Sequence, residues 1–137
     1  MLFRSHADGL DPLVLRRARH VVAENDRVVA TEAALAAGDL AAVGRLFAAS
    51  HASLRDDYEV SCAELDLLVA IASATPGVHA ARMTGAGFGG CIVALAEPSA
   101  VERLAARIEG DYAARSGRSP RVWAVRAVAG AGVVPAP

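Results

Sequence analysis

A dense glycine cluster constrains this chain more than any other feature. Gly85, Gly87, Gly89 and Gly90 fall within six residues of the stretch ARMTGAGFGGC at 81–91. Each glycine adds to the entropy that is lost when the chain is ordered, so a cluster is favoured only where bare backbone is needed. Bare backbone permits positive φ angles, close approach by a ligand or another chain segment, and convergence of N–H groups on an anion. The stretch is therefore predicted to be a closely specified loop.

Two common phosphate-binding motifs do not explain this loop. Gly85, Gly87 and Gly90 match GxGxxG, but that fingerprint opens a helix in dinucleotide-binding proteins. Here the run Cys91-Ile92-Val93-Ala94-Leu95 follows, which is typical of a buried strand. A Walker loop is excluded because no Gly-Lys-Ser/Thr follows the glycines. Three interpretations stay open: a tight structural turn, packing against another element of an active site, and direct contact with phosphate.

Two helices are predicted at the start of the chain. Apolar residues recur at steps of three, four or seven from Pro12 to about Ala37, and Asn25 and Glu32 interrupt that stripe. Gly38 then suits a left-handed helix cap, and Asp39 can accept backbone N–H bonds as the N-cap of the next helix. The residues predicted to be buried are Val14, Ala18, Val21, Val28 and Leu35 in the first helix, and Leu40, Val43, Phe47 and Leu54 in the second.

A third helix and two strands are predicted around the middle of the chain. Ser61 precedes Glu64 with capping-box spacing, and Pro76-Gly77 would stop the helix that they begin. The short segments Val78–Met83 and Cys91–Leu95 flank the glycines and are predicted to be strands joined by that loop. The predicted buried face of the helix consists of Leu65, Leu68, Val69 and Ala72.

The last part of the chain predicts one more helix and one more strand. Ser99 and Glu102 repeat the capping-box spacing, and a helical stripe continues to about Ala114. Val122–Ala127 is predicted to be a final strand, and residues 128–137 a flexible tail. The order of these elements indicates one α+β domain over residues 1–137, a layer of helices on a small antiparallel sheet with its core at about 12–127.

Composition limits the classes of partner and compartment. The chain has 137 residues and a formal net charge of −1, which gives no electrostatic reason to expect nucleic acid or an anionic membrane. Cys62 and Cys91 form no CxxC pair, so reduced thiols are the simplest interpretation. Residues 1–12 lack the apolar core of a signal peptide, and no apolar run has membrane-spanning length. A cytoplasmic protein is therefore predicted.

The loop sequence ARMTGAGFGGC resembles the third conserved motif of the GHMP kinases in its galactokinase form. The segments RHVVAEN at 19–25, GDL at 38–40 and SHASLRDDYEVSC at 50–62 also resemble galactokinase segments, in the same order and at similar spacing. The resemblance runs from about residue 12 to 127, which is nearly the whole chain.

The resemblance implies a fold of the GHMP-kinase C-terminal type, which is ferredoxin-like. It also implies ATP-dependent phosphorylation of the anomeric hydroxyl of galactose, giving galactose 1-phosphate, with Mg²⁺ bound to the nucleotide. In that family the third-motif loop lies beside the phosphate-binding loop of the N-terminal half and helps to shape the active site. The segment DYEVS at 57–61 resembles a stretch near the interdomain cleft. The residues that would take the loop's role are Thr84, Gly85, Ala86, Gly87, Phe88, Gly89 and Gly90.

The chain departs from the family pattern mainly by what it lacks. Ala63 and His79 stand where the family usually has proline and an aromatic residue. The sugar-recognition motif, the phosphate loop and the catalytic aspartate and arginine have no counterpart, so no catalytic residue and no metal ligand is assigned. Phosphoryl transfer needs positioned phosphates, a bridging metal and an oriented nucleophile, which this chain does not supply together. The chain alone is expected to be inactive, and galactose, ATP and Mg²⁺ are expected only for the complete enzyme.

Three hypotheses follow from that absence. The first is the C-terminal part of a galactokinase whose N-terminal half comes from the same or a separate chain; it predicts a large exposed apolar face. The second is a non-catalytic binding or regulatory module that retains the fold. The third, a complete enzyme of 137 residues, is the least favoured.

The carboxylates and histidines have simple structural interpretations. Asp56, Asp57 and Glu59 are a conceivable magnesium site, but a charge cluster between two helices is more often a solvated cap. The histidines show no metal-binding spacing and are treated as structural or surface residues; they are His6, His20, His51 and His79.

The remaining reactive or bulky residues are also interpreted structurally. Cys91 is predicted to be a buried, inert thiol, and Cys62 has no evident base although it lies near a helix N-terminus. Arg82 is assigned either to a phosphate or the missing half, or equally to a surface ion pair. Trp123 is predicted to belong to the core rather than to a ligand platform.

Overall fold

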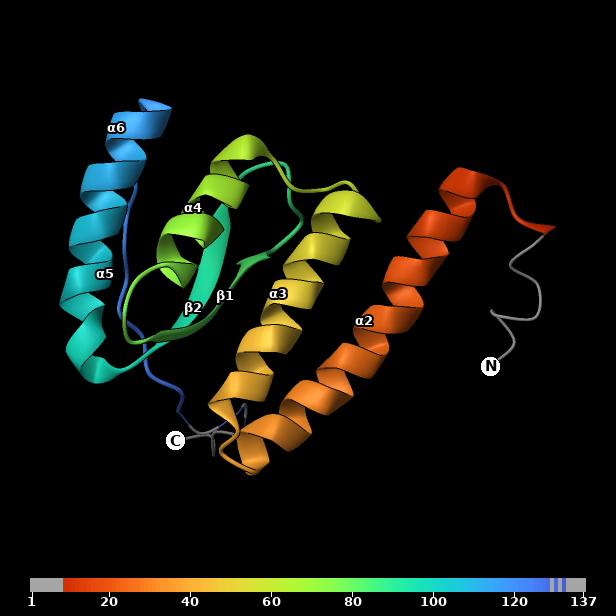
Figure 1. Cartoon of the computed structure of the whole chain (residues 1–137), viewed down its shortest axis with the longest axis horizontal. Helices are drawn as coiled ribbons and strands as arrows, with labels where there is room; N and C mark the ends of the chain where they lie inside the picture. The colour runs from red at the N-terminus through yellow and green to blue at the C-terminus, as the bar shows by residue number, and fades with distance from the viewer. Residues whose placement is uncertain (1–8, 129, 131, 133–137) are drawn as a thin grey trace, which may run out of the picture.

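A computed structural model describes residues 9–128, 130 and 132. Three helices come first: α2 (Pro12–Ala36), α3 (Leu40–Asp56) and α4 (Ala63–Ser73). Two strands follow, β1 (Val78–Thr84) and β2 (Cys91–Ala96), joined by the glycine loop. The last helical segment consists of the 3₁₀ turn η2 (Pro98–Ala100), α5 (Val101–Arg107), the π-helical turn η3 (Ile108–Tyr112) and α6 (Ala113–Ser116). The described chain therefore has the predicted plan of helices on a small antiparallel sheet, shown in Figure 1.

The helices form a row that places β1 at the centre of the packing. Helices α3 and α4 both pack on β1, α2 packs on the outer side of α3, and η3 packs on α4. In Figure 1, α2 and the α5–α6 helix therefore occupy opposite edges of the molecule. In the described part of the chain, no helix is both long enough and apolar enough to cross a membrane.

The sheet is an antiparallel hairpin whose closed end carries the glycine loop. Thr84 pairs with Cys91 at the loop end, and Val78 pairs with Ala96 at the other end, with an irregularity in the register after Val78. Successive residues of a strand face opposite sides, which explains how small side chains on β1 serve two helices. Ala80 packs with the α3 residue Val43. Ala81 instead packs with Val69 and Ala72 of α4.

The caps predicted between α2 and α3 are confirmed, but those predicted for the later helices are not. Asp39 accepts from the backbone N–H of Ala42 at 2.8 Å. Asp11, for which no cap was predicted, accepts from the backbone N–H groups of Leu13 and Val14 at the start of α2. Gly38 has a φ of +69°, the left-handed conformation that suits a helix cap.

The two capping boxes predicted from sequence were wrong in detail. Helix α4 begins at Ala63 and has no side-chain cap, because Ser61 donates to Asp66 at 2.6 Å instead. At the second site the 3₁₀ turn at Pro98 begins the helical segment, and Ser99 lies near Glu97 rather than at an N-cap. Proline at the first position fixes the entry angle, so it decides where this helix starts.

The core is built at the junctions of α3, α4 and β1. Leu54, Val60, Leu65 and Met83 form one buried cluster, and Ile71, Ile108 and Tyr112 form another between α4 and η3. Most predicted core residues of α3 and α4 are buried or half-buried, including Val43 and Leu65, but Leu40 is exposed. Leu40 is the first residue of its helix, where side chains extend beyond the packed layer.

The predicted third strand was wrong. Residues 122–127 have no strand pairing, although Figure 1 shows the segment running past the sheet. A groove of about 960 Å³ is lined by this segment together with β2 and helices α4 and α5. Trp123 is 67% exposed, so its assignment to the core was also wrong. A short apolar segment favours an extended backbone, but it does not supply the neighbouring strand to which that backbone must bond. The predicted tail falls mostly outside the described residues.

The apolar stripe predicted for the first helix exists, but most of it faces outward. Val14, Val21, Val28 and Leu35 are each about half exposed, with Val28 at 59%. Helix α2 instead buries His20 and Ala34 toward α3. Helical periodicity locates an apolar face, but it does not say whether this chain covers that face.

Gly44 allows α3 to approach β1 closely. A Cβ placed at Gly44 would lie 2.4 Å from the backbone oxygen of His79, whereas one at Gly110 would meet nothing within 4 Å. We therefore expect Gly44→Ala to lower the free energy of unfolding by about 1–3 kcal/mol through overpacking. Gly110→Ala, the matched control in a helix, should raise it by about 0.5–1 kcal/mol. Urea unfolding followed by circular dichroism measures both; equal effects of the two variants would contradict this close packing.

Candidate functional site

The glycine loop has a backbone conformation that residues with a side chain rarely adopt. Positive φ angles occur at Gly85 (+83°), Gly87 (+88°), Gly89 (+123°) and Gly90 (+101°), and also at Phe88 (+59°). Positive φ angles cost little for glycine but are unfavourable for residues that carry a Cβ. The cluster is therefore required by the conformation of the loop itself.

Only one of the four glycines is required by crowding as well. A Cβ at Gly87 would lie 2.2 Å from the carbonyl oxygen of Val60, and the N–H of Phe88 donates to that same oxygen at 2.7 Å. The other three, Gly85, Gly89 and Gly90, would meet nothing within 4 Å. One side of the loop is thus fixed against this chain, and the remainder presents bare backbone to open space.

Phe88 combines backbone strain with exposure. It is a bulky residue with positive φ, which is an uncommon conformation, and its side chain is 77% exposed. Strained residues persist where the surrounding structure holds them, and they cluster at functional sites. The hydrogen bond to Val60 is the contact that holds Phe88 here.

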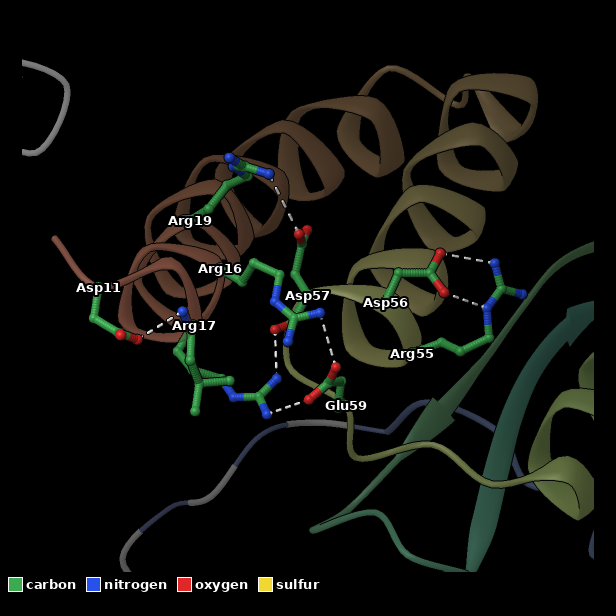
Figure 2. Close-up of polar contacts among 9 residues, drawn as sticks. Asp11, Arg16, Arg17, Arg19, Arg55, Asp56, Asp57 and Glu59 are labelled. Atoms are coloured by element: carbon green, nitrogen blue, oxygen red, sulfur yellow. Dashed lines mark hydrogen bonds and ion pairs between the residues drawn. The ribbon is translucent and has the colours of Figure 1, made fainter. Parts of the chain in front are cut away.

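The corner at residues 57–60 supports the loop and is itself held by arginines of α2. Figure 2 shows Arg16, Arg17 and Arg19 reaching from α2 toward Asp57 and Glu59. Arg17 hydrogen-bonds the carboxylate of Glu59 and donates to the backbone oxygen of Asp57 at 2.6 Å. Arg16 lies 2.9 Å from Glu59, and Arg19 lies 3.7 Å from Asp57.

Glu59 is the second bulky residue with positive φ, at +58°. Hydrogen bonding to Arg17, together with the charge of Arg16, lowers the pKa of its carboxyl group, so Glu59 stays ionised and bound to both arginines. Val60 follows directly, and its N–H donates to the oxygen of Leu54 at 3.0 Å. The two arginines thus hold the residue that precedes the loop's anchor.

A buried polar chain connects α2 to the same corner. His20 Nδ1 lies 3.0 Å from Ser53 Oγ, and Ser53 donates to Asp57 at 3.0 Å. Because the hydroxyl proton goes to Asp57, Nδ1 of His20 must carry the proton that it donates to Ser53. This order is unlike a nucleophile triad, in which the serine gives its proton to histidine. The His20 ring also stacks on Tyr58, with ring centroids 4.6 Å apart.

His51 lies beneath the loop, between α3 and the sheet. Its Nδ1 accepts from the backbone N–H of Met83 at 3.4 Å, and its Nε2 lies 3.1 Å from Asp66. Burial lowers the pKa of His51 and outweighs the nearby carboxylate of Asp66. Burial likewise lowers the pKa of His20. These two histidines therefore have the structural role predicted from sequence.

Arg82 belongs to a half-buried ionic group between α2, α3 and β1. Glu24 accepts from Ser50 at 2.6 Å and from Arg27 at 2.8 Å, and it lies 3.2 Å from Arg82. Burial raises the pKa of Glu24, but the hydrogen bonds from Ser50 and Arg27 and the charge of Arg82 lower it more. From sequence, Arg82 was assigned either to a phosphate or the missing half, or to a surface ion pair. In this structure it pairs with Glu24, and both side chains are half-buried.

The carboxylates considered for magnesium are engaged by arginines in this structure. Asp56 pairs with Arg55 at 2.8 Å, and Asp57 and Glu59 face the α2 arginines described above. Among the described residues, no group of three acidic, histidine or cysteine side chains is placed to hold a metal ion.

The cysteine prediction was partly wrong. Cys91 is exposed rather than buried, and Cys62 is half-buried; both are free thiols. Cys91 is the first residue of β2 and follows the glycine loop directly. Its apolar neighbours in sequence indicated burial, but the first residue of a strand lies outside the packed part of the sheet.

Comparison with known proteins gives a consistent result. Residues 31–114 match the family described as GHMP kinases C terminal. The chain is 51% identical over 124 residues to a galactokinase of Chloroflexus aurantiacus, covering 90% of this chain and 31% of that protein. It is 58% identical over 105 residues to a galactokinase of Bos taurus, covering 77% of this chain and 27% of that protein.

Similarity to a solved structure agrees with these sequence matches. The crystal structure of Lactococcus lactis galactokinase complexed with galactose superposes with a TM-score of 0.81 at 43% identity, over 85% of this chain and 30% of that one. The chain therefore spans about a third of the length of the galactokinases that it matches.

The glycine loop permits a test that separates conformation from crowding. Gly85→Ala introduces a Cβ at positive φ in open space and should lower the free energy of unfolding by about 1–2 kcal/mol. Gly87→Ala adds a collision with Val60 and should cost about 1–3 kcal/mol more. Both variants make the same change in the unfolded chain, so their difference in urea unfolding reports the contact with Val60. Equal losses would show that the loop does not rest on Val60.

The buried histidines predict how stability depends on pH. Their pKa values are lowered in the folded protein from an ordinary value of 6.5, so the unfolded chain binds more protons just below that pH. Stability should be complete above pH 6.5 and fall as the pH drops below it, by at most about 1.4 kcal/mol per pH unit for each histidine. Urea unfolding between pH 5.5 and 8 measures the slope.

Substitution of the histidines should reduce that slope. His20→Asn and His51→Gln keep a polar group in place but cannot titrate, so each should flatten the dependence on pH. Val69→Ala is the matched control, because it weakens the core without removing a titrating group. A slope that stays unchanged in both histidine variants would rule out this origin of the pH dependence.

Proposed function

The chain belongs to the GHMP kinase C-terminal family, and from that premise we propose that it is the C-terminal part of a galactokinase. The complete enzyme would transfer the γ-phosphoryl group of ATP to the anomeric hydroxyl of galactose, giving galactose 1-phosphate and ADP. The observation that carries this proposal is the glycine loop, in which a sequence typical of the galactokinase third motif adopts positive φ at five of the six residues between β1 and β2.

Similarity to galactokinases supports the proposal over a non-catalytic module. The two relatives named above are 51% and 58% identical to this chain and are both galactokinases, and the matching crystal structure is a galactokinase bound to galactose. Because the chain spans about a third of each, we assign the sugar-recognition and catalytic groups to the remaining part of such a protein.

The loop is proposed to contribute bare backbone to the active site. Gly85, Gly89 and Gly90 leave open space where side chains would otherwise stand, which allows a phosphate or another loop to approach the main chain closely. The exposed side chains that frame this surface are Thr84, Ala86 and Phe88. Preorganised backbone of this kind stabilises transferred charge only if it is held rigidly, and the contact with Val60 provides that support.

ATP and Mg²⁺ are assigned to the complete enzyme rather than to this chain. The metal would bridge phosphate oxygens and neutralise the charge that develops during transfer. The acidic residues of the 56–59 corner are bound to arginines, so they do not fit the open oxygen ligands that Mg²⁺ needs. We place the activity in the cytoplasm, in keeping with the free thiols Cys62 and Cys91.

A joined protein tests this function directly. We would link the part of the Chloroflexus aurantiacus galactokinase that lies outside the match to the front of this chain. The joined protein should form galactose 1-phosphate from ATP and galactose, and this chain alone should form none. Product is measured by a coupled ADP assay and confirmed by mass spectrometry.

The loop provides a matched variant for the same assay. Gly89 has a φ of +123° and open space around it, so Gly89→Val should disturb the loop backbone while the core stays intact. We expect kcat of the joined protein to fall at least tenfold, with an unchanged circular dichroism spectrum. A folded joined protein without activity would refute the proposed function, and full activity of Gly89→Val would remove the loop's role from it.

A further inference from the structure

The His51 side chain contacts two elements that meet beneath the glycine loop. It lies in the last third of α3, and its side chain is only 7% exposed. Its Nδ1 accepts from the backbone N–H of Met83 at 3.4 Å. On the other side of the ring, Nε2 lies 3.1 Å from Oδ1 of Asp66, which belongs to α4. The ring therefore bridges the end of β1 and the first turns of α4.

The contact with Met83 fixes the strand end from which the loop leaves. Met83 is fully buried, and the next residue, Thr84, is the last of β1. Its N–H donates to His51, and its backbone oxygen accepts from Nε of Arg82 at 3.1 Å. A buried backbone N–H that loses its acceptor is strongly unfavourable, so the strand end would move to find another.

The contact with Asp66 leads to the segment that anchors the middle of the loop. Ser61 donates to the same carboxylate oxygen of Asp66 at 2.6 Å. Ser61 directly follows Val60, whose carbonyl oxygen accepts from the N–H of Phe88. A series of polar contacts and one peptide bond thus runs from the end of β1, through His51, to the centre of the loop.

The acceptor role of Nδ1 determines the protonation state of the ring. A nitrogen that accepts a hydrogen bond carries no proton, so the single N–H of the neutral ring is on Nε2, facing Asp66. A protonated ring donates from both nitrogens and cannot accept from Met83. The link to β1 therefore exists only while His51 is neutral.

The charged groups around the ring act in opposite directions. Asp66 of α4 and Asp56 of α3 favour the protonated ring, whereas Arg55 of α3 and Arg82 of β1 oppose it. Burial has the largest effect, and the pKa of His51 is lowered from its ordinary value of 6.5. The neutral ring is therefore the form present at neutral pH.

We propose that His51 is a positioning residue for phosphoryl transfer, which in its neutral form holds the β1 end of the glycine loop to the segment that anchors Phe88. This inference rests on the proposed function for the reaction. His51 acts through the backbone of the loop, because its own side chain lies beneath it. Misplacement of a reacting group by about 1 Å can lower a rate by about 100-fold, so the support of this loop affects kcat.

Two variants of the joined protein separate the two contacts of the ring. The side-chain oxygen of asparagine reaches about as far as Nδ1, so His51→Asn keeps an acceptor for Met83. The amide of glutamine reaches about as far as Nε2, so His51→Gln keeps a donor toward Asp66 but loses the acceptor. We expect kcat to fall at least tenfold in His51→Gln and less than threefold in His51→Asn, while KM for galactose changes less than twofold in both.

Val69→Ala is the matched control for these rates, because it weakens the core without touching the ring or the loop. It should leave kcat within twofold of the unsubstituted joined protein, and circular dichroism checks that each variant is folded. Equal losses of kcat in His51→Gln and His51→Asn would show a merely structural role and overturn the positioning. An unchanged kcat in His51→Gln would overturn it as well.

The pH profile of kcat gives a second readout. Protonation of Nδ1 removes the acceptor, so kcat of the joined protein should fall as the pH drops below 6.5. The fall should be smaller in His51→Asn, which cannot titrate, and should persist in His20→Asn, which removes the other buried histidine. The reverse result, persistence in His51→Asn and loss in His20→Asn, would contradict the role of His51.

Nuclear magnetic resonance of this chain tests the ring without any kinase activity. With ¹⁵N-labelled histidine at pH 7.5, two-bond correlations should place the ring N–H of His51 on Nε2, and His51→Gln assigns the signals by their loss. An active joined protein with that N–H on Nδ1 would refute the role of His51 alone. An inactive joined protein would refute the proposed function, and with it any role of His51 in phosphoryl transfer.

Discussion

The carbonyl of Val60 is the point on which the arrangement of this domain depends. It accepts from the N–H of Phe88 and lies where a Cβ of residue 87 would have to be. The side chain of the same residue is buried with Leu54 and Met83. One residue thus joins the end of α3, the core beneath β1 and the loop above it. The loop can keep an unfavourable backbone because its anchor belongs to a buried core cluster.

Support for Val60 comes from outside the core. Glu59 precedes it in a left-handed conformation, and arginines of α2 bind the Glu59 carboxylate. An exposed ion pair contributes little to stability by itself. Here the ion pairs act on geometry. Two guanidinium groups bind the strained residue Glu59, and the backbone of the 57–60 corner then has few ways to relax. The position of α2 is thereby coupled to the position of the glycine loop through Glu59 and Val60.

The sequence predicted the elements that local chemistry specifies and missed those that depend on distant partners. Gly38 ends the first helix through its positive φ, and Asp39 begins the second through its own hydrogen bond. Both could therefore be predicted from sequence. The glycine cluster was recognised for the same reason. Trp123 was misplaced because pattern alone cannot tell whether a neighbouring strand lies near enough to bond. The exposure of Cys91 was missed because burial at a strand end is decided by what covers it.

The ionic layer between α2 and α3 shows more clearly what a sequence pattern cannot predict. A stripe of valines on α2 indicated a buried face, and helical spacing was read correctly. Glu24 nevertheless decides which face of α2 is turned inward. Its hydrogen bonds to Ser50 and Arg27 and its ion pair with Arg82 hold the polar side of the helix toward α3. Arg27 lies three residues away on α2, but Ser50 of α3 and Arg82 of β1 are far from Glu24 in sequence, where no local window reaches. Helix α2 pairs its charged residues inside this domain and leaves its valines exposed, so its composition suits contact with a neighbour on each side. The composition of α2 is therefore explained by a larger protein better than by this chain alone.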